Sequence, residues 1–289
     1  SEENEYLQLI HEILEKGSEV EGRNGKTFSI FGHKMEFSLR DGVLPLLTTK
    51  KVAWKTCFRE LMWFLSGKTS NELLQKQNVK IWNGNASREF LDSRNLQNLR
   101  ENDLGPVYGH QWRHFNAPYV NCDTDYTGQG IDQIQNLIDA LKDQEQHTSR
   151  RLLFCAWNPC QIDQMALPPC HVLAQFSVRE HKYLSCMLYQ RSGDTALGVP
   201  FNIASYSFLT HILATHCGLM ADKFIHVLGD AHLYNDHIEP VKTQIEKTPF
   251  HFPRIKLPKK ENIEDYHESD IVWITPYQHH EEIKMNMVA

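Results

Sequence analysis

The sequence predicts one globular domain that mixes helices with strands. Its 289 residues are 41% hydrophobic and 10% aromatic, which is enough apolar material for a sizeable core. Segments with helical spacing and segments with strand-like alternation follow one another, with no internal repeat and no linker-like stretch between them. We therefore expect a single domain over residues 1–289.

Charge and composition exclude several classes of protein. The net charge of −6 and the absence of a long basic run argue against a general nucleic-acid binder. No stretch approaches the roughly 20 apolar residues of a membrane span, and the first five residues are acidic where a secretory signal would be basic. We expect an intracellular, cytoplasmic protein with neither a membrane nor a nucleic acid as partner. Ser1 in place of Met indicates a processed start or a piece of a longer polypeptide.

The cysteines and histidines predict no metal site. The seven cysteines are an odd number without a Cys-x-x-Cys pair, so we expect reduced thiols. His232 and His237 lack a third ligand at a suitable spacing.

Three segments carry apolar residues at the spacing of an amphipathic helix: 6–14, 54–65 and 131–141. Gly17 and Gly67 follow the first two and are expected to end them.

Apolar residues alternate over 28–39 and predict a pair of strands. The preceding loop, residues 21–27, is punctuated by glycine and carries Arg23 and Lys26. Such a loop is most often a solvated turn. If it holds an anion, Arg23 is the better ligand, because its planar guanidinium matches a phosphate.

The C-terminal half predicts mainly strands, at 152–157, 172–178, 183–190 and 223–228. The second and third are separated by four residues and are expected to form a hairpin.

Residues 203–217 are apolar nearly all round, which predicts a central buried helix closed by Gly218. Asn202 lies at its start, where an amide either caps the helix or reads a ligand. The apolar C-terminus, residues 283–289, is expected to dock on the domain.

The stretch Leu167–His171 places two prolines before a cysteine. Proline fixes φ and has no amide hydrogen, so the backbone before Cys170 is stiff. The strand at 172–178 then puts the thiol at a strand's leading edge. Taken alone, a cysteine that only packs is the commoner interpretation.

Glu60 is a carboxylate on the apolar flank of the helix at 54–65. Its neighbours one turn away are Cys57, Trp63 and Phe64, so desolvation is expected to raise its pKa toward the range of a proton shuttle. A glutamate that reaches water from the helix edge fits the sequence equally well.

Aromatic and basic residues supply further candidates. Trp82 and Trp112 lie in stretches rich in Gly and Tyr, which are suited to form the wall of a pocket for a flat ligand. For either residue alone, packing in the core is the commoner role. Arg150 and Arg151 precede a strand, where surface charge is the usual role.

These residues fit a site in which a thiolate attacks an anionic, planar heterocycle. The chain also resembles the thymidylate synthase family over nearly its whole length, including the synthase domain of bifunctional dihydrofolate reductase-thymidylate synthases. The matching segments follow the family's order: Pro45–Lys50, Glu60–Phe64, Asp103–Arg113, Ser149–Arg151, Ala166–His171, Tyr189–Ser192, Leu197–Tyr206 and Gly229–Tyr234.

The resemblance implies an α+β fold in which helices cover one face of a twisted mixed sheet and a homodimer partner packs on the other. It also implies the conversion of dUMP and 5,10-methylenetetrahydrofolate, a co-substrate, to dTMP and dihydrofolate. Cys170 would add to carbon 6 of the uracil, which makes carbon 5 nucleophilic toward the folate's methylene. After elimination, the folate would return a hydride.

The resemblance also implies the roles of individual residues. Glu60 would organise proton transfers at the pyrimidine, and Tyr108 would help to remove the proton from carbon 5. The implied catalytic set is Cys170, Glu60, Tyr108, Arg191 and Asp194.

Two binding sites are implied by the same resemblance. The residues for dUMP are Arg23, Arg191, Ser192, Gly193, Asp194, Asn202, His232 and Tyr234, with Arg150 and Arg151 reaching across from the partner subunit. The residues for folate are Ile81, Trp82, Asn85, Asp194, Leu197, Gly198, Phe201, Met287 and Val288.

Three segments depart from the family pattern. The loop Arg23–Thr27 is one residue shorter than the usual Arg-Thr-Gly-x-Gly-Thr. Ser177 stands where a tyrosine is common, and Gly193–Thr195 replaces the usual Cys or Ala, Asp, Met.

Three other functions remain open from the residues. A deoxycytidylate hydroxymethylase shares the fold and the thiol but is expected to carry Asp at the position of Asn202. A thiol hydrolase would use His171 as its base, although adjacent strand residues point in opposite directions. A silent RNA-binding protein has little support from an acidic chain.

Overall fold

The computed structural model describes residues 1–288, and its centre is a six-stranded mixed sheet in the order β1-β2-β6-β5-β4-β3. Neighbouring strands are antiparallel except β5 and β6, which are parallel. A second, two-stranded sheet pairs β7 with β8. The strands are β1 Ser18–Gly22, β2 Gly25–Ser38, β3 Leu153–Cys155, β4 His171–Arg179, β5 Tyr183–Asp194, β6 Met220–Tyr234, β7 Arg254–Lys256 and β8 Val272–Thr275.

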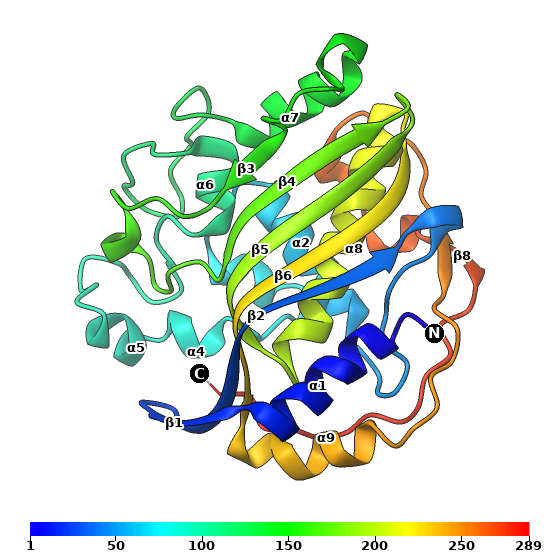
Figure 1. The fold of residues 1–289 in the computed structure, drawn as a ribbon. Coiled ribbons are helices and arrows are strands. Elements are labelled where there is room, and N and C mark those ends of the chain that lie inside the picture. The colour runs from blue at the N-terminus through cyan, green and yellow to red at the C-terminus, as the bar shows by residue number, and fades with distance from the viewer. Residues whose placement is uncertain (289) are drawn as a thin grey trace.

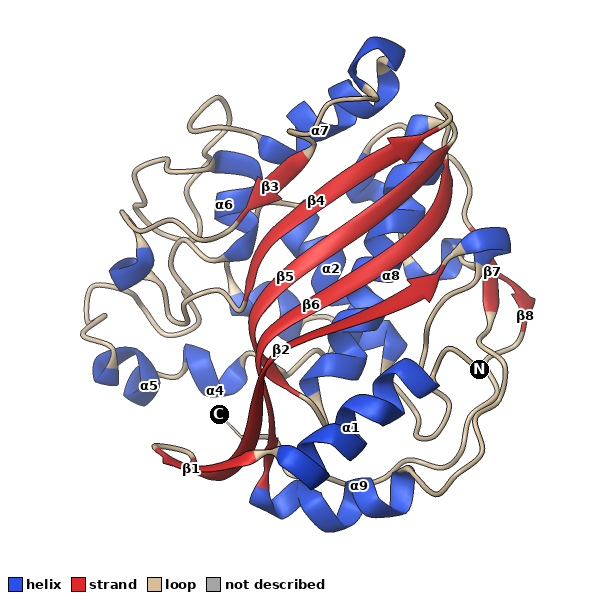
Figure 2. Cartoon of the chain, in the orientation of Figure 1, coloured by secondary structure: helices blue, strands red, loops and turns tan. Residues whose placement is uncertain are grey.

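Helices α2 and α8 lie behind the large sheet, and β4, β5 and β6 turn their other face to the viewer (Figures 1 and 2). This is the α+β arrangement that the family resemblance implies. The helices are α1 Asn4–Lys16, α2 Trp54–Leu65, α3 Asn71–Gln75, α4 Asn83–Ala86, α5 Arg88–Ser93, α6 Tyr108–His114, α7 Gln133–Lys142, α8 Gly198–Cys217 and α9 Ile238–Gln244.

Helix α8 is buried nearly all round, as its apolar sequence predicts. Its Phe208 ring lies edge-on to Phe58 of α2, with centroids 5.2 Å apart. On the other side, Tyr206 stacks on Phe224 of β6 at 6.3 Å. The core therefore joins α2 and the sheet through α8.

The capping interpretation of Asn202 is wrong. Helix α8 begins at Gly198, so Asn202 lies inside the helix rather than at its N-cap. Pro200 occupies the first turn, where a missing amide hydrogen costs nothing. The side-chain amide of Asn202 therefore does not cap this helix.

The strand pair expected over 28–39 is one continuous strand, β2. Gly32 has a φ of +88°, and the apolar positions change there from even-numbered to odd-numbered residues. The change of phase made one strand look like two. The loop at 21–27 is a β1–β2 hairpin, in which Gly22 pairs with Gly25 around Arg23 and Asn24.

Strands β5 and β6 continue to Asp194 and Tyr234, past the predicted ends at 190 and 228. Because the two strands are parallel, their carboxyl ends meet at the same edge of the sheet. Ser192 pairs with Asp230, and Asp194 pairs with His232. Residues that are distant in sequence thus become neighbours.

Candidate active site

Cys170 lies immediately before β4, in a backbone held by the hydroxyl of Tyr108. The Tyr108 oxygen accepts hydrogen bonds from the amides of Cys170, at 2.8 Å, and His171, at 3.2 Å. Tyr108 is the first residue of α6, so the link fixes the thiol segment to a different layer of the fold. Burial, the largest cause, and the charge of Cys170 raise the pKa of this phenol well above its usual range.

Arg191 of β5 holds the same segment from the other side. Its Nε donates to the Pro169 carbonyl at 2.9 Å, and an Nη donates to the Pro168 carbonyl at 3.1 Å. Burial raises the pKa of the Cys170 thiol, and the nearby Arg191 guanidinium opposes this. The arginine thus positions the thiol and also favours its thiolate.

Glu60 is buried on α2, 6% exposed, as the apolar flank predicts. Its Oε2 accepts a hydrogen bond of 2.8 Å from the indole of Trp82. Burial raises the pKa of Glu60 to about 7, and the Trp82 hydrogen bond opposes the rise. The carboxyl can therefore exchange a proton near neutral pH.

The carboxyl ends of β5 and β6 gather the residues expected to hold dUMP. His232 and Tyr234 alternate on β6, with ring centroids 5.3 Å apart. Burial, the largest cause, raises the pKa of Tyr234, and the nearby Asn24 side chain opposes the rise. Tyr234 pairs with Thr27 of β2, so the turn that carries the exposed Arg23 lies at this edge.

Gly193 is set among packed side chains at the same edge. A Cβ there would come within 3.0 Å of Val199 and 3.1 Å of Leu228. The position therefore has little room for a side chain. The nearby Asp194 accepts a hydrogen bond from the Leu197 amide at 3.4 Å and lies 3.9 Å from His237.

Asn202 belongs to a buried polar network that the sequence did not reveal. Its Oδ1 accepts a hydrogen bond of 2.9 Å from Gln190 of β5. Gln190 in turn contacts His226 of β6 at 2.8 Å. Alternating strand patterns do not distinguish a buried polar residue from an exposed one, so only the matched segment Tyr189–Ser192 drew attention to Gln190.

The residues expected to bind folate lie around α4, the start of α8 and the C-terminal segment. Trp82 is the N-cap residue of α4, with Ile81 before it and Asn85 in that helix. Leu197, Gly198 and Phe201 are partly exposed at the start of α8.

The C-terminal segment docks at two points, as its apolar sequence predicts. The Asn286 carbonyl is 2.7 Å from Nε2 of His237, and the Met285 sulfur is 4.0 Å from Nζ of Lys50. Beyond these anchors, Met287 is 64% exposed and Val288 is half-buried.

Arg150 and Arg151 do not contact the other residues expected to bind dUMP. Both are exposed just before β3, and the contacts there involve their backbone: Gln175 donates to the Arg150 carbonyl, and the Arg151 amide donates to Ser149. The arrangement of one subunit thus leaves both guanidinium groups on its surface.

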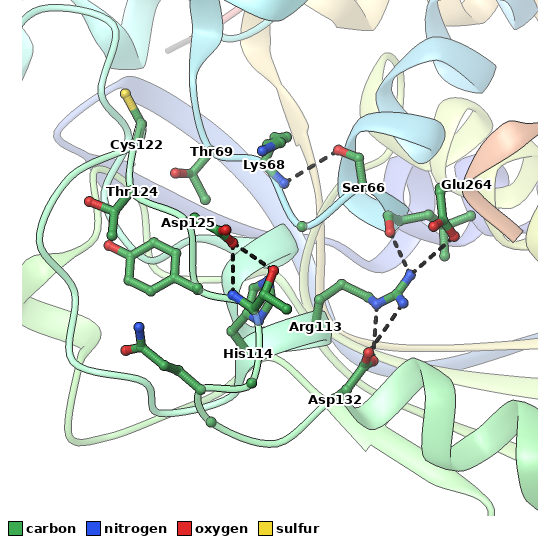
Figure 3. Close-up of a pocket in the computed structure, with 17 residues that line it drawn as sticks. Ser66, Lys68, Thr69, Arg113, His114, Cys122, Thr124, Asp125, Asp132 and Glu264 are labelled. Atoms are coloured by element: carbon green, nitrogen blue, oxygen red, sulfur yellow. Dashed lines mark hydrogen bonds and ion pairs between the residues drawn. The ribbon is translucent and has the colours of Figure 1, made fainter. Parts of the chain in front are cut away.

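A polar cavity of about 380 Å³ lies elsewhere, between the end of α2 and the loop at 122–130 (Figure 3). Arg113 spans it and pairs with Asp132 at 3.0 Å and Glu264 at 3.7 Å. None of the residues proposed for the reaction lines this cavity. Its ion pairs connect α6 to the start of α7 and to Glu264, and they do not point to chemistry.

Residues 1–288 contain neither a candidate metal site nor a helix that could cross a membrane. Among these residues, no cluster of three or more His, Cys, Asp or Glu side chains could hold a metal. His232 pairs with Asp230 and His237 with the C-terminal segment. Over the same residues, every helix is too short or too polar to cross a membrane.

Comparison with known proteins identifies the family. The model of the thymidylate synthase family matches residues 4–289. Over its full length, the chain is 50% identical to a bifunctional dihydrofolate reductase-thymidylate synthase of Paramecium tetraurelia and 51% identical to one of Leishmania amazonensis, covering 62% and 55% of them. It is also 50% identical to a thymidylate synthase of human herpesvirus 8, of which it covers 85%. The chain thus spans little more than half the length of its bifunctional relatives, and it belongs to the thymidylate synthase family.

Proposed function

We propose that the chain is a single catalytic domain that converts dUMP to dTMP, with 5,10-methylenetetrahydrofolate as donor of the carbon and the hydride. The observation that carries the proposal is the position of Cys170. A stiff backbone, the Tyr108 hydroxyl and Arg191 fix the thiol at the start of a strand. The buried Glu60, with a pKa of about 7, lies within the same layer of aromatic side chains.

Each end of the nucleotide has matching chemistry. Arg191, Ser192 and Arg23 bind the phosphate, because guanidinium and hydroxyl donors suit its oxygens. His232 and Tyr234 bind the ribose hydroxyl from the end of β6. Gly193 and Asp194 form the adjacent surface, where the missing side chain of Gly193 lets Val199 and Leu228 pack against the backbone.

The reaction begins when the Cys170 thiolate adds to carbon 6 of the uracil. Carbon 5 then attacks the methylene of the folate. Loss of the proton from carbon 5 expels the folate nitrogen, the folate returns a hydride to the methylene and becomes dihydrofolate, and the Cys170 thiolate leaves carbon 6. Glu60 handles protons at the pyrimidine oxygen and nitrogen, and Tyr108 assists in removing the proton from carbon 5. The buried setting strengthens these interactions, because water competes less for them.

The folate binds over the nucleotide against the side chains at the start of α8. Trp82, Leu197 and Phe201 offer apolar surface to its rings, and Asp194 offers an acceptor. Met287 and Val288 close over the pair and exclude water. Met287 is exposed and is therefore accessible to a ligand.

A homodimer completes the site in this proposal. Met187 and Tyr189 are 42% and 38% exposed on the face of β5 that points away from α8, while Cys186 and Leu188 between and before them are buried. A partner packed on this apolar face would shield it. Arg150 and Arg151, exposed beside the same sheet, would then reach the phosphate of the neighbouring subunit. We also propose a cytoplasmic location.

The test is the formation of dihydrofolate, followed by its absorbance, with purified protein, dUMP and 5,10-methylenetetrahydrofolate. Product formation with dUMP but not with dCMP supports the proposal, and hydroxymethylation of dCMP would favour the hydroxymethylase instead. A thiol hydrolase is disfavoured because burial lowers the pKa of His171 to about 4 and its ring packs against Tyr108 and Tyr206.

A further inference from the structure

The preference of Asn202 for one base depends on which way its amide faces. Uracil offers a carbonyl oxygen and an N–H on its edge, whereas cytosine offers an amino group and a bare nitrogen. An asparagine amide satisfies either pattern, because a rotation of about 180° exchanges its donor and its acceptor. The identity of the residue is therefore not enough to select uracil, and something must hold the amide.

A backbone carbonyl sets the direction of the buried network around Asn202. Nε2 of Gln190 lies 3.0 Å from the Ser192 carbonyl, which can only accept a hydrogen bond. The amide nitrogen of Gln190 must therefore face that carbonyl. The same nitrogen donates at 2.9 Å to the Asn202 atom facing it, which must then be Oδ1.

The other end of the Gln190 amide is an oxygen, and it faces His226. The distance from this Oε1 to Nε2 of His226 is 2.8 Å, so the imidazole must donate from Nε2. Both side chains are buried, with His226 fully inaccessible. Burial, the largest cause, lowers the pKa of His226 to about 3, so the ring is neutral and has one N–H to give.

We propose that His226 is a positioning residue for base selection: its Nε2–H holds the Gln190 amide, which holds Asn202 in the orientation that reads uracil. This inference rests on the proposed function and extends it to a residue with no contact to the substrate. Without His226, the Gln190 oxygen would be buried without a donor, and only the Ser192 carbonyl would oppose a rotation of the Gln190 amide. Asn202 would then present the wrong face to the base more often.

The histidine variants test this through binding of dUMP and dCMP, measured by calorimetry. His226→Leu removes the donor, and we expect the preference for dUMP over dCMP to fall by about tenfold, the worth of one hydrogen bond. His226→Gln keeps a donor at the place of Nε2 and should restore the preference. His211→Leu is the matched control, because His211 is also buried and bonds only the Val43 carbonyl. An unchanged preference in His226→Leu overturns the proposal, as does an equal fall in the His211 control.

A double-mutant cycle shows whether His226 acts through Gln190. In a Gln190→Leu background, His226→Leu should change the preference for dUMP little further. An additive second loss would overturn the proposed route.

The protonated nitrogen of His226 can be observed without any variant or turnover. ¹⁵N NMR of histidine-labelled protein should show the hydrogen on Nε2, and a hydrogen on Nδ1 would overturn the proposal. This readout is separate from the proposed function, which fails instead if the wild-type protein forms no dihydrofolate from dUMP.

Discussion

At the scale of single residues, the candidate site consists of groups whose chemistry is set by burial. Glu60 and Cys170 both meet a low dielectric, which disfavours their charged forms. A specific partner opposes this in each case: the indole of Trp82 for Glu60 and the guanidinium of Arg191 for Cys170. The site therefore balances desolvation against a hydrogen bond at Glu60 and a positive charge near Cys170.

Replacing Cys170 by Ala should abolish turnover and leave dUMP binding largely intact. Binding rests on the arginines and Asn202, whereas only the thiol forms the covalent adduct. Turnover and calorimetric binding of dUMP are the two measurements. Cys160→Ala is the control, because Cys160 is an exposed free thiol outside the site. Turnover that persists in Cys170→Ala would remove the thiol from its proposed role.

Glu60 should make the free energy of unfolding depend on pH. Its pKa is about 7 in the folded protein against an ordinary 4.5, so between these values the folded state holds a proton that the unfolded chain has released. Stability therefore falls as pH rises through this window, by up to about 3 kcal/mol. Glu60→Gln lacks this contribution.

Urea unfolding at about pH 5 and about pH 8 measures the effect. The wild-type protein should lose more stability than Glu60→Gln over this interval. Parallel losses in the two proteins would mean that Glu60 titrates normally in the folded state.

At the scale of elements, the C-terminal segment carries residues of the proposed folate site and is anchored to the rest of the fold. Its anchors, His237 at Asn286 and Lys50 at Met285, come before the last residues. A short truncation therefore leaves the anchors in place and removes only what lies beyond them.

Deletion of Val288 and Ala289 should weaken methyl transfer far more than binding of dUMP. The lost residues would no longer close over the folate, while the nucleotide's own contacts remain. Ala289 lies outside the described residues. The measurements are the KM for folate, kcat and the affinity for dUMP, and His237→Leu is a comparison variant that releases the anchor itself. An equal loss of methyl transfer and nucleotide binding would make the segment a structural element.

At the scale of the whole molecule, the exposed apolar face of the sheet and the two surface arginines have one explanation in the proposed dimer. Arg151 lies exposed just before β3, and in the proposed dimer it binds the phosphate of the partner subunit's nucleotide. Complementation between two inactive variants tests this directly.

Homodimers of Arg151→Ala and of Cys170→Ser should both be nearly inactive, and mixing them should restore activity. In a mixed dimer, one site combines Cys170 of the first variant with Arg151 of the second and is wholly native in composition. Activity should rise as subunits exchange. Mixing Cys170→Ser with Cys170→Ala is the control and should restore nothing. If mass measurement confirms exchange and activity stays absent, Arg151 does not serve a neighbouring site.

Much of this protein can be predicted from sequence because its signals are local. The spacing of apolar residues determined α1, α2, α7 and the buried character of α8, and two prolines before Cys170 marked a rigid thiol. The resemblance supplied the family, which the comparisons confirm. Boundaries were harder to predict, since α8 begins at Gly198 with Pro200 in its first turn, and Gly32 changes the phase of β2 without ending it.

Only the tertiary structure decided what the buried polar groups contact. The pattern of residues along β5 and β6 does not show that a polar residue such as Gln190 or His226 is buried. Nothing in the neighbouring sequence therefore indicates that these two residues meet Asn202. Their meeting depends on the parallel pairing of β5 with β6 and on the packing of α8 across both. Local pattern determines which face of an element is buried, whereas long-range packing decides which partners it finds there.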